Sequence, residues 1–127
     1  MDGSAMTKPD TARLVRAWFD AAGQADGPVL PDGWFGGRAR ENTFFLEDVL
    51  ELDDALVVRL SDDTTIQFDS PGRVSVENSD LVFDGYRRAT LRWRDYGGGL
   101  DTSYQERTYE DGQVRLAAPI GTNVELS

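Results

Sequence analysis

The chain has 127 residues with no cysteine and no histidine, and its formal net charge is −10. This composition excludes disulfide bonds, thiolate chemistry and histidine-based catalysis or metal ligation. The negative charge also disfavours nucleic acids and anionic membranes as partners. The length predicts a single domain, residues 1–127, built around one hydrophobic core.

The first residues lack the basic and apolar regions of a secretory signal, and no apolar run is long enough to span a bilayer. These features predict a cytoplasmic protein. All basic residues except Lys8 are arginine, a bias that we interpret as a sign of a GC-rich bacterial gene.

After a flexible tail at residues 1–8, residues 9–24 are predicted to form an amphipathic helix. Apolar residues recur at spacings of three and four, which places one stripe on the helix surface. The stripe contains Leu14, Val15, Trp18, Phe19 and Ala22. Glycine at position 23 is a typical helix end, and a helix this short must pack its stripe on a sheet to be stable.

Residues 25–42 are rich in proline and glycine, and we predict a long loop there. The loop contains Trp34, Phe35 and Arg38. Tryptophan and arginine are enriched in binding hot spots, so an exposed Trp34 would anchor a partner. The alternative is that Trp34 and Phe35 pack down and close the end of the core.

From residue 43 the apolar period changes to two. The pattern predicts about seven short antiparallel strands over 43–118, followed by an edge strand or tail at 119–127. We therefore predict an α+β fold, in which one N-terminal helix packs on a curved antiparallel meander that resembles an open barrel or a sandwich.

The first strand of this meander contains an interruption. Alternation assigns Phe44, Leu46, Leu50 and Leu52 to the inner face and Glu47 and Glu51 to the outer face. Asp48 breaks the alternation, which predicts a bulge or a strand edge nearby.

Arg88, Arg92 and Arg94 share the outer face of one predicted strand. Guanidinium groups bind carboxylates and phosphates, so this row is a candidate surface for an anion or an acidic partner. The alternative is pairing across the sheet. The candidate pairing residues are Glu47, Glu51, Glu77, Gln105 and Glu106.

Two predicted turns carry adjacent aspartates, Asp53 with Asp54 and Asp62 with Asp63. We interpret them as a candidate patch for a basic partner, the alternative being ordinary solvated turns. Carboxylate catalysis and calcium binding are further alternatives, although no Asp-x-Asp-x-Asp-Gly loop occurs.

These observations predict a small, acidic, non-enzymatic module that binds another protein, one form being an immunity- or antitoxin-like protein that blocks a basic partner. No cofactor or metal is predicted. The first alternative is a small-ligand carrier whose cavity is lined by Trp18, Phe19, Phe44 and Trp93. The second is a carboxylate-based enzyme. Homodimerisation by pairing of sheet edges is also open.

Overall fold

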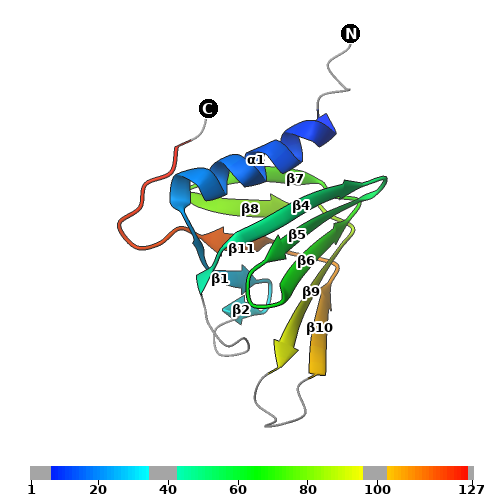
Figure 1. The fold of residues 1–127 in the computed structure, drawn as a ribbon. Helices are drawn as coiled ribbons and strands as arrows, with labels where there is room; N and C mark the ends of the chain where they lie inside the picture. Colours follow the sequence, from blue (N-terminus) through cyan, green and yellow to red (C-terminus); the bar gives the residue numbers. More distant parts are fainter. Residues whose placement is uncertain (1–6, 35–42, 96–102, 126–127) are drawn as a thin grey trace.

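The computed structural model describes residues 7–34, 43–95 and 103–125. Helix α1 spans Thr7–Ala22 (Figure 1), two residues earlier at each end than the sequence predicts, so Thr7 and Lys8 belong to the helix and not to a tail. The helix ends where Gly23 adopts a φ of 84° and donates its N–H to the Phe19 carbonyl at 2.8 Å. Glycine adopts this left-handed conformation without steric cost.

The strands within the described ranges form two antiparallel sheets, one of six strands and one of five. The first sheet contains β1 (Ala25–Leu30), β2 (Gly33–Trp34), β3 (Thr43–Phe44), β7 (Arg73–Glu77), β8 (Asp80–Asp84) and β11 (Val114–Ala117). The second sheet contains β4 (Leu46–Leu52), β5 (Ala55–Leu60), β6 (Thr64–Asp69), β9 (Arg88–Asp95) and β10 (Ser103–Tyr109). Their orders are β2-β1-β11-β8-β7, with β3 also paired to β1, and β10-β9-β6-β5-β4.

The expectation of a helix packed on antiparallel strands is confirmed, but the expectation of one meander with about seven strands is wrong. The segment 25–42 was expected to be a loop, yet it contains β1 and β2. Strand β1 pairs with β11, from the far end of the chain, and its register shifts between Asp26 and Val29. This irregularity accommodates Gly27 and Pro28, the residues that make the segment look like a loop.

The two sheets pack around one core. The ring of Phe68 in β6 stacks on that of Phe83 in β8, with 4.3 Å between centroids. The ligand-carrier hypothesis placed Trp18, Phe19, Phe44 and Trp93 around a cavity. These four side chains instead belong to the packed core, and none has more than 6% of its surface exposed.

Helix α1 lies across one side of the molecule, against β4 and β7, which are the edge strands of the two sheets (Figure 1). Trp18 donates its indole N–H to the Ser79 carbonyl in the β7–β8 turn at 2.7 Å. Arg16 donates to the Val49 carbonyl of β4 at 2.9 Å and lies 3.8 Å from the Asp48 carboxylate. The helix therefore covers sheet edges that another chain could otherwise pair with.

A bulge in β4 reverses the faces that the sequence predicts for the rest of this strand. The pairing register with β5 shifts between Leu46 and Asp48, close to the expected position. Beyond it Val49 is buried, whereas Leu50 and Leu52 are 38% and 55% exposed. The assignment of these two leucines to the core is wrong, because one extra residue exchanges the two faces of a strand.

The segment after β11 forms no strand over the residues described there, 118–125, but it is not a free tail either. Val124 is buried in the core, and its N–H donates to the Ser79 hydroxyl at 3.0 Å. The predicted edge strand or tail is thus an irregular segment fastened to the β7–β8 turn.

Candidate functional site

The four aspartates of the predicted acidic patch lie in two turns at opposite ends of β5. Asp53 and Asp54 form the β4–β5 turn, whereas Asp62 and Asp63 form the β5–β6 turn. A strand of this length spans about 20 Å, so the two turns belong to two separate surfaces.

The Asp62–Asp63 turn has a structural role. Both residues have positive φ, 61° and 53°, which aspartate tolerates better than most residues. The Asp62 carbonyl accepts a hydrogen bond from the Thr64 hydroxyl at 3.1 Å. The Asp63 carboxylate lies 3.2 Å from Arg94, so part of its charge is compensated within the chain.

Arg88, Arg92 and Arg94 occupy one face of β9, as alternation predicts, and each lies near a carboxylate. Arg88 is 3.8 Å from Glu110, and Arg92 is 4.0 Å from Glu106. The three carboxylates near these arginines are thus Glu110, Glu106 and Asp63. Only Glu106 was among the expected partners. Such exposed pairs contribute at most about 1 kcal/mol each.

Tyr104 of β10 joins two of these arginines. The Arg92 guanidinium lies over its ring at 4.2 Å from the centroid, and Arg94 donates to its hydroxyl at 3.0 Å. These contacts favour cross-strand pairing over an anion site as the role of the row.

The aromatic loop is described only in part. Trp34 pairs with Val29 in the short β1–β2 hairpin, so its backbone belongs to the first sheet and not to a loop. Phe35 and Arg38 lie outside the described residues. Their proposed role in binding stays a prediction.

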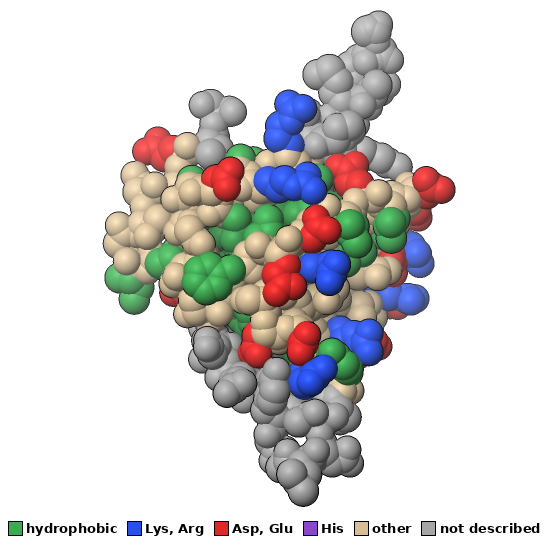
Figure 2. All heavy atoms as spheres, in the orientation of Figure 1, with side chains coloured by type: hydrophobic (Ala, Val, Ile, Leu, Met, Phe, Trp, Pro, Cys, Tyr) green, Lys and Arg blue, Asp and Glu red, His purple; other side chains and the backbone are tan. Residues whose placement is uncertain are grey.

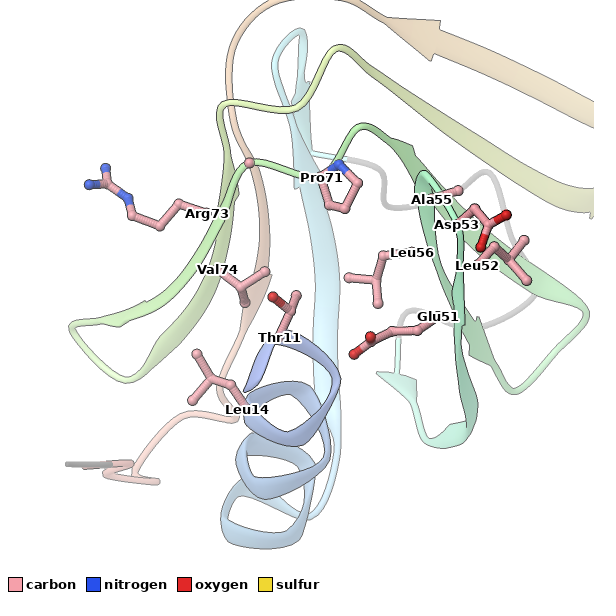
Figure 3. A pocket seen from close by; sticks show the side chains of 11 residues that line it. Thr11, Leu14, Glu51, Leu52, Asp53, Ala55, Leu56, Pro71, Arg73 and Val74 are labelled. Atoms are coloured by element: carbon pink, nitrogen blue, oxygen red, sulfur yellow. The ribbon is translucent and has the colours of Figure 1, made fainter. Parts of the chain in front are cut away.

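A pocket of about 420 Å³ opens at the end of the molecule that carries the β4–β5 and β6–β7 turns, here called the pocket end (Figure 3). Its apolar wall is contributed by α1, β5, the β6–β7 turn and β7. The side chains concerned are Leu14, Leu56, Pro71 and Val74, and Thr11 adds a hydroxyl. Helix α1, strand β5 and the continuous segment from the β6–β7 turn into β7 therefore meet at this pocket.

Gly72 allows the β6–β7 turn to form this wall. A Cβ at position 72 would lie 2.5 Å from the Asp84 carbonyl oxygen, closer than van der Waals contact permits. The turn therefore packs directly on the backbone of the β8–β9 connection, which holds the neighbouring Pro71 against the pocket.

Glu51 of β4 points into the pocket. It pairs directly opposite Leu56 of β5, and opposite residues of an antiparallel pair lie on the same face. Figure 3 shows its carboxylate directed toward the space between α1 and β5, whereas Arg73 points away from that space. Among the side chains that the structure describes, none forms an ion pair or hydrogen bond with Glu51.

Leu50 and Leu52 form an exposed apolar strip on the opposite face of β4, and Leu52 also borders the pocket. Figure 2 shows exposed hydrophobic side chains beside acidic and basic ones on this face of the molecule. Simple alternation missed both the strip and the inward Glu51. The irregularity at Asp48 was the signal that could have revealed them, because a bulge at that point inverts the faces of everything after it in the strand.

Comparison with protein-family models, curated proteins and solved structures finds no match. Within the described ranges, no three acidic side chains come together as a metal site would require. No helix in the same ranges has the length and apolarity needed to cross a membrane. Fold and surface geometry are therefore the observations that bear on function.

Proposed function

We propose that this chain is a small binding module that docks a basic protein at its pocket end. The pocket carries the proposal, because the Glu51 carboxylate borders its apolar wall, and Asp53 and Asp54 lie in the adjacent β4–β5 turn. A desolvated apolar centre with a polar rim is the usual anatomy of a protein interface. The net charge of −10 favours a basic partner and speeds its encounter.

The apolar strip supports a macromolecular partner. Leu50 and Leu52 continue the apolar surface from the pocket onto the outer face of β4, beyond the reach of a ligand held in the pocket alone. Exposed apolar surface rimmed by polar groups marks interaction sites. An immunity- or antitoxin-like protein, which covers the basic active site of its target, is one form of this function, and the absence of enzymatic activity stays a prediction.

The test compares how much of a partner protein is captured by variants of the two aspartate turns. The double variant Asp53→Asn with Asp54→Asn should retain less of a basic partner in a pull-down from source-cell lysate at low salt, because it removes two charges beside the pocket. The wild-type complex should weaken as salt is raised. Mass spectrometry of the retained proteins measures both effects.

The matched control is Asp62→Asn with Asp63→Asn, which removes the same charge from the other end of β5. Asparagine tolerates the positive φ of both positions. Circular dichroism checks that both variants are folded. Equal loss of the partner from the two variants would mean that overall charge, and not the pocket end, governs binding.

A small-ligand carrier is a second candidate, supported by the pocket volume of about 420 Å³, within the usual range for small-molecule sites. Native mass spectrometry of protein purified from its source cells should then detect a bound small molecule. Leu14→Trp, which fills the pocket, should release it. Retention of the molecule in the filled variant would place its site elsewhere.

A further inference from the structure

The pocket combines two kinds of surface that suit one kind of occupant. Leu14, Leu56 and Val74 reach it from a helix and from strands of both sheets, and they present only hydrocarbon. Its volume of about 420 Å³ far exceeds the roughly 30 Å³ that one water molecule occupies in the liquid. A ligand with an extended apolar part therefore fits this wall.

Glu51 adds a negative charge to this hydrocarbon surface. The carboxylate reaches the pocket only because the β4 bulge turns it to the inner face. Glu51 is exposed to solvent at the mouth of the pocket, where its carboxylate can accept a charge-assisted hydrogen bond from a cation, and no described side chain supplies one. Arg73 also lines the pocket, but its guanidinium points away from it and lies 3.4 Å from Asp84.

We infer that the pocket receives a protruding lysine or arginine side chain of the partner protein, with its aliphatic stem on the apolar wall and its charged head on Glu51. Long basic side chains carry hydrocarbon and charge in this order along their length. The inference rests on the proposed function, since it names the group by which the basic partner is recognised.

The test uses small probes, so it does not depend on finding the partner. The N-acetyl methylamides of lysine and arginine are titrated into the isotopically labelled protein, and backbone amide shifts are followed by NMR. The N-acetyl methylamide of norleucine, which has the same stem without charge, is the matched probe. We expect saturable shifts around Leu56 and Val74 with a basic probe, and binding about two- to five-fold weaker for norleucine.

Glu51→Gln keeps the shape of the side chain and should abolish this preference for the charged probe. Glu47→Gln makes the same change on β4 outside the pocket and should retain it. Equal responses to norleucine and both basic probes in the wild type would overturn the inference, as would the absence of saturable shifts at the solubility limit. An unchanged preference in Glu51→Gln would also overturn it.

The two proposals fail separately. If the basic probes bind the pocket no more strongly than norleucine but the Asp53–Asp54 variant still loses its partner, the docking function stands and the basic-side-chain inference fails. If the probes bind as expected but the pull-down shows no difference between the variants, the pocket chemistry stands and docking of a protein at this end fails.

Discussion

Among the titratable side chains that the structure describes, Tyr86 has the pKa that its surroundings raise most. The residue is 6% exposed and its ring packs beside Phe68, and its hydroxyl has no hydrogen-bond partner among the described groups. Burial, followed by the nearby charges of Asp84 and Asp111, raises the pKa of Tyr86 from 10.0 to about 12. A phenolate at this position would be a poorly solvated charge beside other negative charges.

This pKa predicts how stability depends on alkaline pH. Because the folded pKa lies above the unfolded one, the Tyr86 contribution is complete below pH 10 and is lost as pH rises toward about 12. Tyr86→Phe should remove that loss. At neutral pH it should be neutral or stabilising by up to about 1 kcal/mol, because the variant no longer buries an unpaired hydroxyl. Urea unfolding across this pH range measures both effects, and parallel curves for the two proteins would contradict the assignment.

At the scale of elements, the bulge in β4 decides which side chains reach the core. Upstream of it Phe44 is buried, as alternation predicts, while downstream Val49 replaces Leu50 and Leu52 on the inner face. The same shift brings Glu51 to the pocket. One irregularity therefore creates both the apolar strip and the inward carboxylate.

Two substitutions on adjacent residues test this register. Val49→Thr should lower the free energy of unfolding by about 1–3 kcal/mol, because it places a hydroxyl in the core. Leu50→Thr should lower it by less, about 1 kcal/mol or under, because Leu50 is 38% exposed and threonine suits a strand. Urea denaturation measures both. The reverse order would mean that β4 pairs with β5 without the bulge.

At the scale of the whole molecule, contacts on two sides hold the sheets together. Helix α1 joins β4 to β7, and Asp32 of the β1–β2 turn contacts β10 of the second sheet. Its carboxylate lies 2.9 Å from Arg107 and accepts a hydrogen bond from the Tyr109 hydroxyl at 3.0 Å. Burial and then this hydrogen bond raise the pKa of Tyr109.

Removal of the Asp32 side chain should weaken the contact between the β1–β2 turn and β10. Asp32→Ala should lower the free energy of unfolding by about 1 kcal/mol, since the groups are partly exposed, and should lower the pKa of Tyr109 toward its usual value. Asp32→Asn keeps an acceptor without the charge and should have a smaller effect on stability. Urea unfolding and NMR titration of the tyrosine ring test these outcomes. An unchanged Tyr109 pKa in Asp32→Ala would show that the bond does not form in solution.

Local patterns in the sequence determined the helix and many of the strands and turns. The stripe containing Val15 and Trp18 predicts α1 because helical periodicity depends only on near neighbours. Alternation likewise predicts β5, β6 and the core of β9, where each strand has apolar residues on one face. The positions of the β9 arginines and of the aspartate turns also follow from local spacing. Their partners depend on strand pairing, and of these only Glu106 was expected.

Only the tertiary structure decided which segments pair and what they enclose. Strand β1 is recognisable through its pairing with β11, more than eighty residues away along the chain, and its Gly27 and Pro28 hide it from local patterns. The division into two sheets depends on the β7–β8 hairpin. It lies between β6 and β9 along the chain, which pair with each other in the second sheet, yet β8 pairs with β11 in the first sheet. The pocket arises where α1, β5 and the β6–β7 turn meet, and Glu51 enters it because pairing with β5 sets the register after the bulge. Composition determined the charge of this protein, whereas long-range pairing determined where that charge meets an apolar surface.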